Sequence, residues 1–115
     1  MMSKVNNLMS ITKPWGSYKL LTKNEKTTVK IIMLNAGNRT SLQLHNHRFE
    51  KWFVLKGEGI ITLEKPKQVK IGDEIFIPVK TPHRIEAITD FTILEISYGL
   101  FDELDILRLE DDFGR

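Results

Sequence analysis

The sequence contains no cysteine, which excludes disulfide bonds, thiolate metal ligands and a thiol nucleophile. It has no apolar run of membrane-spanning length, and its opening residues MMSKVNNLMS lack the apolar stretch of a signal peptide. The charges nearly cancel, with 17 Lys and Arg against 15 Asp and Glu, and no basic run is interleaved with aromatic residues. We therefore expect a cytoplasmic protein with no nucleic-acid and no membrane partner.

The composition favours one folded unit. A chain of 115 residues suits a single domain with a limited but adequate core. Hydrophobic residues make up 41% of the chain, and low-complexity sequence is scarce, which argues against disorder. We expect one domain over residues 1–115, with a core at about 28–99, an N-terminal extension at 1–27 and a C-terminal tail at 100–115.

Short apolar and β-branched runs alternate with turn signals through the core. The run 28–34 is followed by the turn sequence Asn-Ala-Gly-Asn at 35–38. Strands this short at this spacing predict an all-β sandwich or barrel. The other expected strands cover residues 40–45, 50–55, 59–63, 68–71, 74–78, 83–87 and 91–97.

Apolar residues fall on both faces of the strand at 50–55. If Glu50 and Trp52 face inward, Phe53 and Leu55 face outward. An outer face in contact with water would carry polar residues, so this one is expected to be covered. The cover is the N-terminal segment 13–18, the tail or a partner subunit. Because large apolar patches are uncommon on monomers, we expect a homodimer.

Four polar side chains form a candidate metal site. Gln43 and His45 are alternate residues of one strand and point the same way, and a turn can return the chain to present Glu50 beside them. Only folding brings His83 close. Imidazole, carboxylate and amide oxygen suit a divalent first-row ion, with zinc expected first and manganese, cobalt, nickel or iron(II) as alternatives. Gln43 has a second interpretation, a hydrogen bond within the core.

The stretches 37–57 and 72–83, which carry these residues, resemble the two cupin motifs. Gln43 stands where the first of two histidines usually occurs, Lys80 replaces the second glycine of the second motif, and Ala87 replaces its terminal asparagine. The resemblance implies the double-stranded β-helix, or jelly roll, of cupins. The loss of the glycine concerns the shape of the loop before His83.

A narrower resemblance covers nearly the whole chain. The segments KPWGSY, SLQLHNHRFEKW, FIPVKTPHRIE and LEDDFGR are similar to type II mannose-6-phosphate isomerase, a domain often fused behind a GDP-mannose pyrophosphorylase. The resemblance implies a metal-dependent isomerase that interconverts mannose 6-phosphate and fructose 6-phosphate through a cis-enediol. It also makes a separate GDP-mannose pyrophosphorylase a candidate docking partner for this chain.

Such a reaction needs a base for proton transfer and cations for the phosphate. A general base must reach the proton and have a pKa near the working pH. The candidate catalytic residues are His47, Lys80 and Glu95, with Glu86 as a further carboxylate. The candidate phosphate ligands are Arg39, Arg84 and Arg115, whereas Arg48 is expected to be a solvated loop charge.

Three other functions remain open at the level of sequence. The first is an isomerase or epimerase for another sugar phosphate or nucleotide sugar, since the metal chemistry would be unchanged. The second is a cupin that binds a sugar phosphate without turnover. The third is an iron(II) oxygenase, for which His45, His83 and Glu50 supply the required two histidines and one carboxylate.

Overall fold

The structure is a computed structural model that describes residues 9–115, and these residues form strands and no helix. It accordingly contains no helix suited to crossing a membrane within that range. The strands are β1 (Met9–Lys13), β2 (Gly16–Leu20), β3 (Thr27–Leu34), β4 (Leu42–Leu44), β5 (Arg48–Lys56), β6 (Glu58–Thr62), β7 (Pro66–Lys70), β8 (Glu74–Ile77), β9 (Arg84–Ala87), β10 (Phe91–Gly99) and β11 (Leu107–Glu110).

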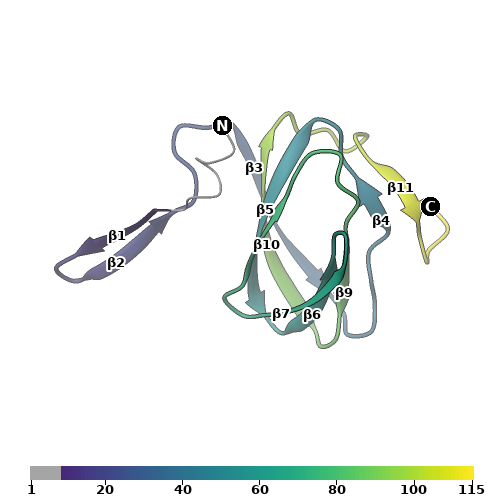
Figure 1. Cartoon of the computed structure of the whole chain (residues 1–115), viewed down its shortest axis with the longest axis horizontal. Coiled ribbons are helices and arrows are strands. Elements are labelled where there is room, and N and C mark those ends of the chain that lie inside the picture. Colours follow the sequence, from purple (N-terminus) through teal and green to yellow (C-terminus); the bar gives the residue numbers. More distant parts are fainter. Residues whose placement is uncertain (1–8) are drawn as a thin grey trace.

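Two antiparallel sheets face each other around the core (Figure 1). One sheet has the strand order β3-β10-β5-β8, and the other has the order β7-β6-β9. The second sheet continues beyond β9, because bridges at Arg39↔Glu86 and Gln43↔His83 join it to β4, which pairs with β11. The all-β jelly roll expected from the sequence is thereby confirmed.

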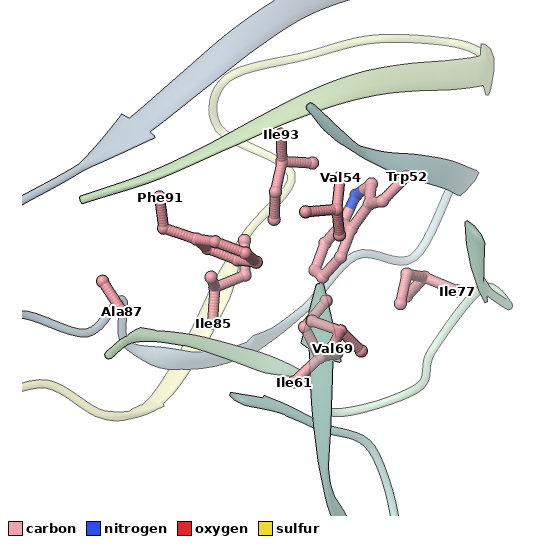
Figure 2. Packing of buried hydrophobic residues seen from close by; sticks show 9 residues of the cluster. All are labelled: Trp52, Val54, Ile61, Val69, Ile77, Ile85, Ala87, Phe91 and Ile93. Carbon is pink, nitrogen blue, oxygen red and sulfur yellow. The ribbon is translucent and has the colours of Figure 1, made fainter. Parts of the chain in front are cut away.

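The apolar core lies between the two sheets (Figure 2). Trp52 and Val54 of β5 and Phe91 and Ile93 of β10 point inward from the larger sheet, each at most 3% exposed. The opposite sheet and β8 complete the cluster with Ile61, Val69, Ile77, Ile85 and Ala87. These side chains occupy one part of the barrel interior and leave the rest to polar residues.

The turn between β5 and β6 requires a glycine. Gly57 has a φ of 81°, a region that side chains with a Cβ rarely adopt. A Cβ at this position would also collide with the carbonyl oxygen of Asp90. This turn brings β6 back into the sheet opposite β5, so the interior is closed on both sides.

The strands differ from the sequence prediction by one or two residues at one or both ends, and the differences at β4 and β5 lie nearest the site. The strand expected at 40–45 is reduced to β4 at Leu42–Leu44, and β5 begins at Arg48 rather than at Glu50. The hairpin of β1 and β2 was not predicted at all, because its strands are short and rich in polar residues. It stands away from the barrel (Figure 1).

The N-terminal extension covers part of the outer face of the larger sheet. Leu21 packs against Ile96 and Tyr98, together with Phe49, Phe53 and Phe76. The Tyr98 hydroxyl donates a hydrogen bond to the Leu21 carbonyl at 3.0 Å. A short segment after the hairpin therefore supplies some of the cover that the outward-facing phenylalanines require.

Candidate metal centre

Three buried side chains converge inside the barrel. His45 follows β4, Glu50 lies in β5, and His83 precedes β9. One ligand atom from each lies within 4.8 Å of the others. Gln43 is held beside His83, because its N–H donates to the His83 carbonyl at 3.0 Å and its carbonyl accepts from the His83 N–H at 2.8 Å. The structure thus brings together three of the four side chains proposed as metal ligands, and Gln43 lines the cavity that His45 and His83 also border.

Both imidazoles are held with the same nitrogen turned toward the cluster. Nδ1 of His45 lies 2.7 Å from the Asp105 carbonyl, and Nδ1 of His83 lies 2.8 Å from the Thr81 carbonyl. A carbonyl only accepts, so each Nδ1 carries the proton and each Nε2 is unprotonated, with its lone pair turned toward the cluster. Burial lowers the pKa of both histidines and so favours this neutral form.

Glu50 is oriented by two neighbours on its own strand. Its Oε1 accepts a hydrogen bond from Trp52 Nε1 at 3.1 Å, and its Oε2 accepts one from Arg48 Nε at 2.9 Å. The same Oε2 lies 3.6 Å from His45 Nε2. A carboxylate that is only 1% exposed is costly to bury unless it is paired, and these donors meet that need.

Arg48 is a buried member of the cluster, so the expectation of a solvated loop charge is wrong. Its side chain is 5% exposed and lies over the Phe101 ring, 4.5 Å from the centroid. Its Nη2 also donates to His45 Nε2 at 3.3 Å. A metal ion on that nitrogen would replace this hydrogen bond, so metal binding requires Arg48 to turn away from His45.

The donor set fits a divalent first-row ion. Two neutral imidazoles and Gln43 border a cavity of about 110 Å³, and the carboxylate of Glu50 lies 3.6 Å from Nε2 of His45. Such a mixture of nitrogen and oxygen donors suits zinc and its neighbours. The other residues around the cavity are Lys30, Ile32, Thr40, Arg48, Trp52, Ile85, Glu95, Glu103, Ile106 and Arg108.

Glu95 is a second buried carboxylate in the wall of this cavity. It is 4% exposed, receives a hydrogen bond from the Ser97 hydroxyl at 3.2 Å and lies 3.5 Å from Lys30 Nζ. Burial, reinforced by the nearby negative charge of Glu50, raises the pKa of Glu95 to about 7. Of the three residues predicted to be catalytic, this is the one that the structure brings to the cavity.

The structure places His47 and Lys80 elsewhere. Both side chains are exposed, and neither borders the cavity. Lys80 contributes through its backbone instead, because its N–H donates to the His45 carbonyl at 2.7 Å. Its φ of 58° lies in the left-handed region, so the lysine keeps the loop shape that a glycine would adopt there.

The three arginines expected to bind phosphate are paired with carboxylates of the acidic tail. Arg39 Nε lies 2.6 Å from Asp112, Arg84 Nη1 lies 3.0 Å from Glu110, and Arg115 Nε lies 2.9 Å from Asp111. None of the three arginines borders the cavity. The tail docks on the barrel, as predicted, through the pairing of β11 with β4. Its carboxylates thereby pair with the three arginines.

Sequence reasoning missed three charged residues of the cavity wall. Lys30 lies two residues before the inward-facing Ile32 in β3, so both side chains are on the same face of the strand. The strand pattern could therefore have predicted that Lys30 points into the barrel. Glu103 and Arg108 come from the tail. Their position depends on the pairing of β11 with β4, and no local sequence pattern predicts that pairing.

A jelly roll with two histidines and a carboxylate converging in its interior defines a cupin with a candidate metal centre. Comparison with known families makes the assignment narrower. Residues 2–111 match the family described as mannose-6-phosphate isomerase C-terminal. The chain belongs to this family.

Similar curated proteins are considerably longer than this chain. The alginate biosynthesis protein AlgA of Pseudomonas aeruginosa is 34% identical over 117 residues, which cover 98% of this chain and 24% of that protein. Mannose-1-phosphate guanylyltransferase 2 of Escherichia coli O157:H7 is 33% identical over 107 residues, with 90% and 22% covered. The chain therefore spans about a quarter of these relatives.

Solved structures support the fold. The capsular polysaccharide assembling protein CapF of Staphylococcus aureus aligns with 90% of this chain and 34% of its own, at a TM-score of 0.63 and 21% identity. A salicylate 1,2-dioxygenase of Pseudoaminobacter salicylatoxidans aligns with 63% of this chain and 20% of its own, at a TM-score of 0.60 and 20% identity. At this level of identity the likeness concerns the fold alone.

Proposed function

We propose that this protein is a metal-dependent aldose–ketose isomerase that interconverts mannose 6-phosphate and fructose 6-phosphate. The observation that carries the proposal is one cavity bordered both by two members of a metal-type donor set, His45 and His83, and by a separate carboxylate with a pKa of about 7, Glu95. The third member of the donor set, Glu50, lies 3.6 Å from Nε2 of His45. Membership of the mannose-6-phosphate isomerase C-terminal family supports the choice of substrate.

In this proposal Gln43, His45, Glu50 and His83 hold one divalent ion, zinc in the first place. The bound ion supplies electrophilic stabilisation of the negative charge that develops on the sugar oxygens. The protein's part is to keep both Nε2 atoms unprotonated, because the Asp105 and Thr81 carbonyls hold the proton of each ring on Nδ1. Arg48, once released from His45 Nε2, remains paired with Glu50.

Glu95 is the proposed base. Its carboxylate takes the proton from C2, next to the aldehyde carbon, and returns it to C1, while the proton of the C2 hydroxyl passes to the oxygen on C1, so the reaction passes through a cis-enediol. A base works best when its pKa lies near the working pH, and burial puts Glu95 there. Lys30, 3.5 Å away, stabilises the ionised form.

Lys30 and Arg108 are the exposed cations at the cavity and are the proposed contacts for the substrate phosphate. Arg39, Arg84 and Arg115 would serve this purpose only after exchanging their tail carboxylates for phosphate. His47 and Lys80 would need a comparable change of position to act on the sugar.

The proposed setting is the cytoplasm, where phosphorylated sugars are made and used. Similarity to about a quarter of the length of proteins named mannose-1-phosphate guanylyltransferase supports a role in the same cell compartment as that activity. Docking to a separate GDP-mannose pyrophosphorylase is part of the same proposal.

A coupled assay tests the reaction directly. Protein stripped with a chelator receives one metal at a time, and fructose 6-phosphate formed from mannose 6-phosphate is measured, with glucose 6-phosphate as the comparison substrate. We expect turnover to return with one or more metals in the wild type and not in His83→Ala. Metal binding without turnover on mannose 6-phosphate would refute the isomerase.

A sugar-phosphate-binding protein without turnover is the second candidate, and Arg48 is the observation that favours it. Its hydrogen bond to His45 Nε2 places a protein cation within the ligand set. If the metal-free protein binds mannose 6-phosphate in calorimetry and added metals give no turnover, this second candidate replaces the first.

A further inference from the structure

The hairpin of β1 and β2 has one apolar and one polar face. Residues directly opposite each other in an antiparallel pair share a face. Ile11 lies opposite Tyr18 on one face, and Ser10 lies opposite Lys19 on the other. The turn adds Trp15, which stacks on Tyr18 with 6.5 Å between the ring centroids and is 73% exposed.

This hairpin turns its polar side toward its own barrel. Lys19 Nζ binds Glu74 of β8 at 3.2 Å, and Leu21 is fixed by the Tyr98 hydroxyl. Beyond these contacts the hairpin extends away from the barrel (Figure 1), in a molecule with a longest extent of 51 Å. An isolated two-stranded hairpin is at best marginally stable in water, so its apolar face needs a partner surface.

A second exposed apolar surface lies on β3. Val29, Ile31 and Met33 alternate along the outer face of this strand and are 54%, 56% and 76% exposed. We call these three residues the β3 stripe. The stripe adjoins Leu94 of β10, which lies opposite Ile31. Contiguous apolar side chains at a sheet edge are the usual mark of an interface.

The hairpin of the same chain is held away from this stripe. In the sheet order β3-β10-β5-β8, Leu21 at the base of the hairpin is held at β10 and Lys19 within the hairpin is held at β8, so the hairpin is directed away from the stripe on β3. Three strand spacings, roughly 14 Å, separate β8 from β3. The tail cannot cover the stripe either, because β11 pairs with β4 in the other sheet.

We propose that two copies of this chain exchange their hairpins, so that the apolar face of each hairpin lies on the β3 stripe of the other copy. One chain carries both complementary surfaces but cannot join them to each other, which is the condition for a reciprocal contact across a twofold axis. Tyr18 and Trp15 of one copy then cover the β3 stripe of the other, and the polar hairpin face remains in water. The proposal is independent of the isomerase activity.

The molar mass of the full-length chain in solution is the first test, measured by light scattering after size-exclusion chromatography. One chain has a mass of 13.4 kDa, and we expect twice that value for the wild type. A hairpin variant, Trp15→Ser with Tyr18→Ser, and a stripe variant, Ile31→Glu with Met33→Glu, should each have the mass of one chain. Ile71→Glu is the matched control, since Ile71 is 63% exposed outside both surfaces, and it should keep the wild-type mass.

Each alternative arrangement gives a different result. A wild type with the mass of one chain overturns the proposal. Loss of the dimer in the stripe variant alone would mean that two stripes meet face to face, and loss in the hairpin variant alone would mean that two hairpins meet. Circular dichroism of each variant must match the wild type, which separates loss of association from loss of folding.

A mixture of the two variants gives the sharpest test. The hairpin variant retains a normal stripe, and the stripe variant retains a normal hairpin, so a mixed pair keeps one of the two contacts. We expect the mixture to form a two-chain species that neither variant forms alone. A mixture that stays at the mass of one chain at all protein concentrations contradicts exchange.

Discussion

The two ends of the barrel interior are built on the same strands and differ in chemistry. At one end the inward positions are ionisable or polar, and a few residues further along each strand they are apolar. Trp52 stands at the boundary, because its indole N–H binds Glu50 while its ring meets His83 edge-on at 5.4 Å. The inward residues change from Glu50 to Val54 in β5, from Ser97 and Glu95 to Ile93 and Phe91 in β10, and from His83 to Ile85 and Ala87 at β9.

The difference shows how one scaffold separates stability from chemistry. The apolar end stabilises the fold by removing hydrocarbon from water. The polar end keeps charges in a buried place where they shift one another's pKa, at a cost to stability. Substitutions at the polar end should therefore change activity or metal binding, and substitutions at the apolar end should change the free energy of unfolding. Four experiments test this, in order of decreasing effect.

The largest effect is expected at the polar end, in Glu95→Gln. If Glu95 is the base, the isomerase rate falls by about 10²- to 10⁴-fold, the usual contribution of a positioned base. Metal retention should stay at the wild-type level, because Glu95 is not among the proposed ligands. The measurement is kcat at saturating metal together with the bound metal per chain. A variant that keeps its full rate would show that the base lies elsewhere.

Phe91→Ala tests the apolar end. Phe91 is 1% exposed, and emptying its place costs about 3–5 kcal/mol of unfolding free energy. The folded fraction should still bind metal, because no proposed ligand is touched. Urea unfolding gives the free energy, and Phe113→Ala is the control, since Phe113 is 61% exposed. Equal losses in both variants would contradict the assignment of Phe91 to the core.

The third prediction concerns how the stability of the metal-free protein depends on pH. The pKa of Glu95 is about 7 in the folded state against 4.5 for the free group, so the unfolded chain releases this proton first as the pH rises. Stability should accordingly fall between pH 4.5 and 7. The difference of 2.5 pKa units corresponds to about 3 kcal/mol. Unfolding of wild type and Glu95→Gln at pH 5 and pH 8 measures it, and the fall should be absent from the variant.

The smallest effect is expected at the boundary, in Trp52→Phe. Phenylalanine keeps a ring against His83 but removes the N–H that orients Glu50. Loss of such a supporting hydrogen bond weakens metal affinity by about 10- to 100-fold. Competition with a chromogenic chelator measures the affinity, and Trp15→Phe at the exposed hairpin should leave it unchanged. A Trp52→Phe protein with wild-type affinity would assign the indole to packing alone.

Strand pattern predicted the all-β class, whereas the jelly-roll topology came from the resemblance to the cupin motifs. Alternation placed Glu50 and Trp52 inward and Phe53 outward, and β5 has this arrangement. Gln43, His45 and Glu50 are close in sequence, so a strand and a turn were enough to bring them together. His83 required the resemblance to a known motif, because nothing local connects it with the first three.

The charged surroundings could not be predicted, because they depend on contacts distant in the chain. The partners of Arg39 and Arg84 are in the tail, 73 and 26 residues away. Arg48 looked like a loop charge and is buried because Phe101 covers it. The hairpin was missed because its apolar face is made of few residues and is not paired within the chain.

The hydrogen bond from His45 to the Asp105 carbonyl connects the tail with the rate at which a metal ion would enter and leave the site. It spans 60 residues, and the Asp105 carboxylate also accepts the backbone N–H groups of Asn46 and His47, both at 2.9 Å. We expect local opening of the tail, with the barrel still folded, to free His45 for rotation, and metal ions to enter and leave mainly during these openings. Amide hydrogen exchange at Asn46 and His47 and metal release to a chelator should then share one opening rate.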